Sequence, residues 1–176
     1  MSTNRILPVY AHRDPDASRV NRALLDAAAS LSNVTVHNLA ERYPDLHIDT
    51  EHEQRLLPEH DTIVLQFPFY WYSTPAILKE WQDAVFAYGF AYGTNGDKLQ
   101  GKKLMVATTM GGPAAAYEAG GYNQFTLSEL LRPLQATANL TGMRYEPIFS
   151  VSGTHTLDQA ALDRAATAYH ARLSSL

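Results

Sequence analysis

Apolar runs typical of β-strands alternate with stretches of helical periodicity along most of this chain. Five runs indicate strands, namely ILPVYA (6–11), VTVHNL (34–39), TIVLQF (62–67), KLMVATT (103–109) and YEPIFSV (145–151). Helical spacing recurs at residues 20–31, 77–86, 127–140 and 158–173. Strand–helix alternation of this kind favours parallel strands joined by crossover helices, so we predict an α/β, doubly wound sheet of five parallel strands with helices on both faces.

The length of the chain limits the number of cores that it can form. With 176 residues it is long enough for one hydrophobic core and too short for two, so residues 1–176 are expected to form a single domain. A flavodoxin-like sheet is the expected version of the doubly wound fold at this size.

Local signals refine the predicted elements. Residues 50–53 (TEHE) and 126–129 (TLSE) both fit the capping box that begins a helix, and Gly142 is placed to end the second of these helices. Pro8 cannot donate a hydrogen bond within the first strand, which predicts a bulge or an unpaired position there. Pro133 is expected to kink or divide its helix.

Composition and missing motifs exclude several classes of protein. A formal net charge of −4 is the opposite of the basic surface that nucleic acid requires. The absence of cysteine excludes disulfides, a thiolate nucleophile and a cysteine-based zinc site. The histidines between positions 37 and 60 include no pair at the i, i+4 spacing of a helical zinc site, so no metal is expected. A nucleophile elbow, a Walker loop and a GxGxxG fingerprint are also missing.

Apolar segments long enough for targeting or membrane insertion are not found. No segment approaches the roughly 18 apolar residues that a membrane span needs, and the first residues do not resemble a signal peptide. We therefore expect a cytoplasmic protein that reaches the inner face of the membrane only through a partner.

The loop after the first predicted strand, HRDPDASRVN (12–21), leads into a helix. Amides at a helix start, with Ser18 and Asn21 as small polar groups and His12 nearby, suit a phosphate. The alternative is that Ser18 is an ordinary helix N-cap and His12 a turn residue.

The loop after the third predicted strand lies in QFPFYWYSTPAILKEW (66–81). Aromatic faces and backbone amides from Pro68 to Tyr72 can shield and hold a flat electron-accepting ring. Alternatively, these rings pack in the core and in a dimer interface. Pro75 fits the first turn of the helix that follows.

The loop after the fourth predicted strand, TMGGPAAAYEAGGYN (109–123), contains paired glycines. Gly111 and Gly112 allow the backbone to approach a flat ligand closely, and Tyr117 can donate a proton or a hydrogen bond. An ordinary glycine turn is the alternative.

Together, YAH…S…N, PFYWYSTPAILKEW and TMGGPAAAY resemble the flavodoxin-like NAD(P)H:quinone oxidoreductases. RYPDLHID (42–49) and LQATANLTGM (134–143) look most like the short bacterial branch that contains the Kef potassium-efflux ancillary flavoproteins. The resemblance implies a homodimer that binds FMN, with FAD as the alternative, and passes two electrons from NAD(P)H to quinones or similar acceptors by a ping-pong mechanism. The alternative function is regulatory, in which the protein binds and activates a Kef-type potassium/proton antiporter.

The resemblance also implies roles for individual residues. Tyr117 corresponds to a tyrosine that assists charge relay to the reduced flavin. The implied cofactor-binding residues are His12, Ser18, Arg19, Val20, Asn21, Pro68, Phe69, Tyr70, Trp71, Tyr72, Thr109, Met110, Gly111, Gly112 and Tyr117. Met110 and Asn123 depart from the family pattern, which has a second threonine at the first position and, in mammalian relatives, a relay histidine at the second. Because asparagine cannot exchange a proton near neutral pH, we expect solvent or Tyr117 alone to carry it.

Overall fold

A computed structural model describes residues 4–176. Its strands form one parallel sheet in the order β2-β1-β3-β4-β5, and β6 pairs with the same edge of β4 as β5. The strands are β1 (Ile6–Tyr10), β2 (His37–Asn38), β3 (Thr62–Pro68), β4 (Lys103–Thr109), β5 (Arg144–Tyr145) and β6 (Phe149–Val151). This is the strand order of flavodoxin-like doubly wound folds, so the predicted fold class is confirmed.

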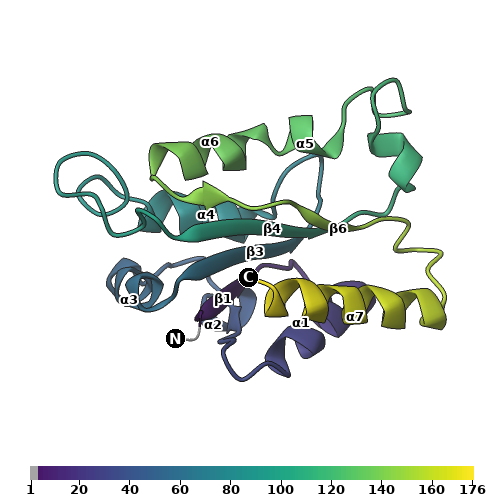
Figure 1. The fold of residues 1–176 in the computed structure, drawn as a ribbon, viewed down its shortest axis with the longest axis horizontal. Coiled ribbons are helices and arrows are strands. Elements are labelled where there is room, and N and C mark those ends of the chain that lie inside the picture. Colours follow the sequence, from purple (N-terminus) through teal and green to yellow (C-terminus); the bar gives the residue numbers. More distant parts are fainter. Residues whose placement is uncertain (1–3) are drawn as a thin grey trace.

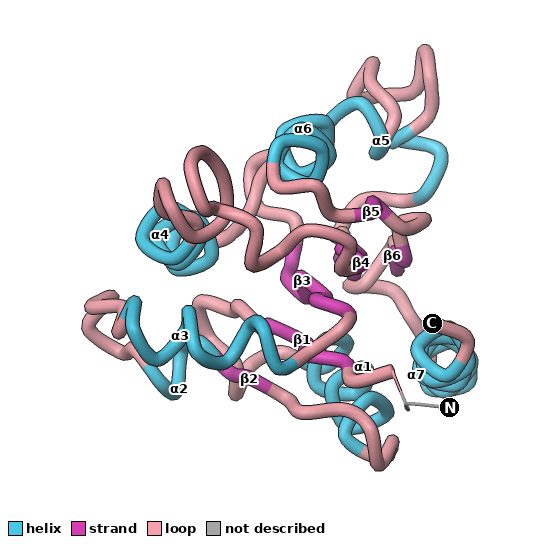
Figure 2. Tube along the Cα trace, turned by 60° about the vertical axis from the view of Figure 1, so that its left-hand side comes forward, coloured by secondary structure: helices cyan, strands magenta, loops and turns pink. Residues whose placement is uncertain are grey.

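Helices cover both faces of this sheet (Figure 1). They are α1 (Arg19–Ala29), α2 (Leu39–Arg42), α3 (Thr50–Leu56), α4 (Ala76–Val85), α5 (Leu127–Leu130), α6 (Arg132–Leu140) and α7 (Gln159–Ser174), with the short 3₁₀ helices η1 (Leu57–Glu59) and η2 (Ala114–Tyr117). Figure 2 shows α1 and α7 on one face and α4 and α6 on the other. Between residues 4 and 176, none of the helices combines the length and the apolar character that crossing a bilayer requires.

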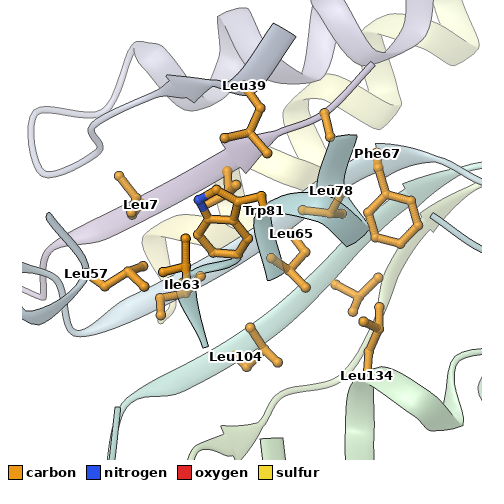
Figure 3. Packing of buried hydrophobic residues seen from close by; sticks show 14 of the residues in the cluster. Leu7, Leu39, Leu57, Ile63, Leu65, Phe67, Leu78, Trp81, Leu104 and Leu134 are labelled. Atoms are coloured by element: carbon orange, nitrogen blue, oxygen red, sulfur yellow. The ribbon is translucent and has the colours of Figure 1, made fainter. Parts of the chain in front are cut away.

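Alternate residues of the central strands supply two hydrophobic cores, as expected for a sheet buried on both faces. In β3, Ile63 and Leu65 belong to the core beneath α4 and α6, whereas Val64 belongs to the core beneath α1 and α7. Figure 3 shows the first core, where Trp81 of α4 lies among Leu7, Ile63 and Leu65.

The second strand is shorter than predicted, and Pro8 accounts for the difference. Ile6 exchanges backbone hydrogen bonds with Asn33 and Thr35, which places it against the strand-2 side of β1. Pro8 is the next residue that faces this side, and it has no N–H to donate. Pairing with β2 therefore resumes only at His37–Asn38. Every residue of β1 pairs in register with β3, so Pro8 causes an unpaired position rather than a bulge.

The fifth predicted strand is wrong as a single element. Residues 145–151 divide into the end of β5 and the whole of β6, which pair with different parts of β4. Pro147 lies in the interruption and lacks a backbone donor, which is a physical reason for the break.

Three signals between residues 126 and 142 are confirmed. The Thr126 hydroxyl accepts from the Glu129 amide at 3.2 Å, and the Glu129 carboxylate accepts from the Thr126 amide at 2.8 Å. Pro133 lies in the first turn of α6, so the predicted helix is divided into α5 and α6. Gly142 follows α6 with a φ of +69°, the left-handed conformation expected of a residue that ends a helix.

The capping box predicted at Thr50 is wrong. Asp49 is the N-cap of α3, and its side chain accepts from the His52 amide at 3.0 Å. Glu53 does not fold back to the helix start because its side chain points into the core, where it is fully buried.

Glu53 is the centre of a buried polar cluster formed with His37, Tyr43 and Trp81. The carboxylate accepts from His37 Nε2 at 2.9 Å and from Trp81 Nε1 at 2.8 Å, and the Tyr43 hydroxyl also donates to it. Burial alone raises the pKa of Glu53, but the three hydrogen bonds together outweigh it and hold the pKa below its ordinary value. The cluster ties β2 and the residues after α2 to α3 and α4.

Candidate functional site

Loops that follow β1, β3, β4 and β6 meet at the carboxyl edge of the sheet, where open α/β folds bind their ligands. They line a cavity of about 350 Å³. The predicted site residues in its lining are His12, Ser18, Arg19, Val20, Asn21, Pro68, Phe69, Tyr70, Thr109 and Gly111. The predicted residues outside its lining are Trp71, Tyr72, Met110, Gly112 and Tyr117.

The loop after β1 presents the beginning of α1 to this cavity. His12 is buried, and its Nδ1 accepts from the Asp14 amide at 3.0 Å. Burial lowers the pKa of His12, so its imidazole is neutral near pH 7. Ser18 occupies the N-cap position of α1, but its side chain makes no capping hydrogen bond. The amides at the start of α1 are therefore left for a ligand such as a phosphate.

Arg19 and Val20 line the cavity, although each also has a structural contact elsewhere. The Arg19 guanidinium donates to the Leu157 carbonyl at 2.7 Å and to Gln159 Oε1 at 3.4 Å, so it holds the segment after β6. Val20 packs in the core beneath α1 and α7. The guanidinium of Arg19 is therefore not an uncommitted positive charge in the cavity, and Val20 supplies only apolar surface.

Asn21 connects the first and third loops. Its Nδ2 donates to Thr109 Oγ1 at 2.7 Å, while its Oδ1 is buried without a hydrogen-bond partner among residues 4–176. Gln66 of β3 donates to the Asn21 carbonyl at 3.0 Å and accepts from the Tyr169 hydroxyl at 3.0 Å. Because a buried amide oxygen without a partner is costly, Asn21 Oδ1 marks a position where a ligand hydroxyl is favoured.

The aromatic residues after β3 form a tight turn. Tyr70 and Ser73 exchange two backbone hydrogen bonds, and the central residues Trp71 and Tyr72 have φ values of +48° and +61°. Both φ values are those of a type I′ turn, a conformation that bulky residues rarely adopt and that costs about 1–3 kcal/mol per residue. The Trp71 side chain is 93% exposed. The turn therefore projects Trp71 into solvent instead of packing it in the core.

The third loop places Tyr117 beside Gly112. A Cβ added to Gly112 would lie 3.4 Å from the Tyr117 ring, and the Phe69 ring lies 6.1 Å from the Tyr117 ring. Tyr72 donates to Asn123 Oδ1 at 3.1 Å, which links this loop to the aromatic turn. Burial, followed by the nearby Tyr72, raises the pKa of Tyr117, and a hydrogen bond with Asn123 acts in the opposite direction. Tyr117 is therefore a neutral phenol near pH 7.

A larger cavity of about 760 Å³ adjoins the first one. It lies between the loop after β1, residues 38–46 and the beginning of α4, and His12 and Tyr70 line both cavities. The two rings are 6.1 Å apart in an edge-to-face arrangement. His12 and Tyr70 thus form the boundary between the two cavities.

Three residues in the lining of the smaller cavity were not predicted from the sequence. They are Ala17, Thr154 and His155. The available signal for the last two was a polar Thr-His pair just after the fifth strand pattern, because the carboxyl ends of parallel strands share one edge of the sheet. Across residues 4–176, no group of three or more histidine, aspartate or glutamate side chains is arranged to hold a metal ion.

The strand order and the position of the cavity define a flavodoxin-like protein, and the chain belongs to the family described as flavodoxin-like fold, which matches residues 4–173. It is 46% identical to the glutathione-regulated potassium-efflux system ancillary protein KefG of Pectobacterium atrosepticum, over 97% of this chain and 93% of that protein. The resemblance inferred from the sequence motifs is therefore confirmed.

Two solved structures share this fold over almost their whole length. General stress protein 14 of Treponema denticola, solved in complex with FMN, has a TM-score of 0.92 and 37% identity and covers 97% of this chain and 98% of its own. An NADPH-quinone reductase from P. pentosaceus has a TM-score of 0.88 and 38% identity and covers 96% of each chain.

Proposed function

We propose that this chain is a flavin-dependent NAD(P)H oxidoreductase that passes two electrons to a quinone or a similar acceptor by a ping-pong mechanism. The observation that carries the proposal is the cavity at the carboxyl edge, where a phosphate-type loop, an aromatic turn and a Gly-Gly loop meet. It is supported by similarity to a protein solved with FMN and to an NADPH-quinone reductase.

The residues around the cavity fit a flavin mononucleotide. The amides at the start of α1 suit its phosphate, since Ser18 makes no capping bond to them. The unpartnered Asn21 Oδ1 suits a ribityl hydroxyl. Phe69 and Tyr70 supply aromatic surface, and Gly111 supplies backbone without a side chain. We propose the cofactor-binding roles of the predicted residues on this basis.

A bound flavin would accept hydride from NAD(P)H and return two electrons to the acceptor, because that redox chemistry belongs to the cofactor. The chain supplies orientation and control of protons. Phe69 and Tyr70 exclude water from one wall of the cavity, and Tyr117 holds its proton on a neutral phenol that can donate a hydrogen bond. Asn123 accepts from Tyr72 and cannot itself relay a proton, so Tyr117 or solvent carries it.

FMN is the proposed form of the cofactor, and FAD is the alternative that the larger cavity keeps open. An adenosine attached to the flavin phosphate needs space beyond the loop after β1, and the cavity of about 760 Å³ begins there at His12. Mass spectrometry of the chromophore released by heating distinguishes the two.

We propose that a second copy of the chain completes the site. Trp71 is 93% exposed and Tyr122 is 89% exposed, and the hydrogen bond from Tyr72 to Asn123 places the segments that carry them side by side. Large exposed rings grouped in this way are typical of an interface. A homodimer would cover these rings and convert the open side of the turn into a wall of the site.

The decisive experiment begins with the absorption spectrum of the purified protein. We expect a flavin spectrum, or its appearance after reconstitution with FMN, followed by NADH or NADPH oxidation that requires an added quinone. A chain that takes up neither FMN nor FAD contradicts the proposal. A chain that binds flavin but transfers no electrons to any quinone limits the proposal to flavin binding.

Regulation of a potassium/proton antiporter is the second candidate function. The 46% identity to an ancillary protein of a potassium-efflux system favours it, and it does not exclude redox activity. Through such a partner the protein would lie at the inner face of the membrane. Potassium efflux from cells that express a Kef-type antiporter, measured with and without this chain, tests the regulatory function.

A further inference from the structure

His155 lies in a loop to which the sequence motifs assign no role. The loop connects β6 to α7, and its residues Thr154 and His155 line the smaller cavity together with His12, Ser18 and Asn21. The cavity therefore has a wall from the carboxyl end of a fourth strand, in addition to the three predicted loops.

Backbone contacts hold this loop against the loop after β4. The Gly153 amide donates to the Gly112 carbonyl at 2.8 Å, and the Thr154 amide donates to the Met110 carbonyl at 3.1 Å. Gly153 has a φ of +66°, which allows the chain to reverse here without strain. The other end of the loop is held by the hydrogen bond from Arg19 to the Leu157 carbonyl. The loop is thus held on both sides of His155, by backbone amides before it and by the Arg19 side chain after it.

The imidazole of His155 lies directly over Gly111. A Cβ built on Gly111 would lie 2.6 Å from His155 Nε2 and 2.9 Å from its Cδ2, which is closer than real Cβ atoms come to other atoms. Glycine at position 111 therefore makes room for the His155 imidazole. This contact places Nε2 beside the wall proposed for the flavin.

The other basic groups of the cavity are committed elsewhere. Arg19 donates to Leu157 and Gln159, and the Nδ1 of the neutral His12 accepts from the Asp14 amide. No side-chain hydrogen bond to His155 occurs within residues 4–176, and its side chain is exposed at the cavity. An imidazole N–H donates a strong hydrogen bond to an anionic oxygen.

We propose that His155 is a cofactor-contacting residue whose Nε2 donates a hydrogen bond to an anionic oxygen of the bound flavin. The proposal rests on the proposed flavin site. The oxygen belongs either to the phosphate or to the reduced ring, and both present the same chemistry to an imidazole donor.

The test compares flavin binding by the apo forms of the wild type, His155→Ala and His170→Ala. His170 is a matched control because it lies on α7 and does not line the cavity. Fluorescence titration with FMN and with riboflavin gives the two dissociation constants, and a redox titration of the FMN-loaded protein gives the midpoint potential.

Loss of a hydrogen bond to an anion is expected to weaken binding roughly 10- to 100-fold. If the oxygen belongs to the phosphate, FMN binding falls by this factor and riboflavin binding does not change. If it belongs to the reduced ring, the affinity for oxidised FMN changes little and the midpoint potential falls by about 30 mV per factor of ten. Either result supports the proposal, and His170→Ala should match the wild type.

The proposal is overturned if the wild type binds FMN while His155→Ala equals His170→Ala in both affinities and in the potential. Failure of the wild type to bind any flavin is a different result, which contradicts the proposed function itself. Gly111→Ala adds an independent measurement, because it pushes His155 away from its position. Its effect on FMN affinity should largely disappear in the Gly111→Ala, His155→Ala double variant, and an undiminished effect would show that the new methyl group obstructs the flavin directly.

Discussion

Replacement of Glu53 by glutamine should destabilise the fold through the buried cluster that Glu53 forms with His37, Tyr43 and Trp81. The carboxylate accepts from all three side chains and is fully buried. A glutamine has the same shape, but it carries one acceptor oxygen and an NH₂ group that must face a donor. At least one buried donor and the new N–H groups then lack partners, at about 1–3 kcal/mol each.

The expected loss is therefore about 3 kcal/mol, a large part of the roughly 5–15 kcal/mol by which a protein of this kind is stable. For a chain of this length it corresponds to a fall in Tm of roughly 6–12 °C. Glu51→Gln is the matched control, since Glu51 lies on the same helix with its side chain 88% exposed. It should change the free energy of unfolding by less than about 0.5 kcal/mol.

The pH dependence of the free energy of unfolding, compared between the wild type and Glu53→Gln, is a second measurement. The pKa of Glu53 is held below its ordinary value of 4.5 in the folded chain. A depressed carboxyl pKa contributes stability that is fully present above 4.5 and is lost as the pH falls through the folded value. In urea unfolding, the difference in the free energy of unfolding between the wild type and Glu53→Gln should therefore become smaller below pH 4.5. Equal stability of Glu53→Gln and Glu51→Gln at pH 7 would refute the role given to the cluster.

Further predictions concern the candidate site, the proposed dimer interface and the residue that ends α6. Tyr117→Phe should slow flavin reduction by NADPH in stopped-flow measurements by roughly tenfold or more while leaving FMN affinity near that of the wild type, and an unchanged rate would leave Tyr117 as a packing residue. Because the pKa of Tyr117 is raised, this difference between the two proteins should persist from neutral pH to about pH 9. If the proposed homodimer forms, Trp71→Ser should shift it toward the monomer in light scattering, and a dimer of unchanged affinity would remove Trp71 from the proposed interface. Gly142→Ala should lower the free energy of unfolding by about 1 kcal/mol, because its φ of +69° is strained for alanine.

Most of the fold could be predicted from the sequence because local pattern and tertiary structure agree there. The strand patterns at 62–67 and 103–109 coincide with β3 and β4 to within a residue, since central strands buried on both faces must be apolar throughout. The edge of the sheet was less predictable. Pro147 divides the fifth strand, and the effect of Pro8 on β2 depends on which neighbour Pro8 faces.

The residues that line the cavity could be predicted from the sequence where they are neighbours within one loop. Residues of the first loop line one cavity together with Pro68, Phe69 and Tyr70, as the topology requires, whereas Trp71 and Tyr72 lie outside it because the turn points them into solvent. Glu53 was misassigned because a capping box and a buried acceptor look the same in sequence, and only the positions of His37, Tyr43 and Trp81 separate them. His155 was missed because its contact with Gly111 joins residues that are far apart in the chain.

The turn at residues 70–73 has a consequence for engineering the protein. Its two central positions demand left-handed backbone, for which Asn-Gly is the favoured pair and Trp-Tyr is among the least favoured. A sequence redesigned for thermal stability alone would therefore replace Trp71 and Tyr72 first and gain stability in the isolated chain. Such a variant would be more stable but would lose the exposed rings proposed for the dimer interface, so a screen for thermostable variants should keep these two positions fixed from the start.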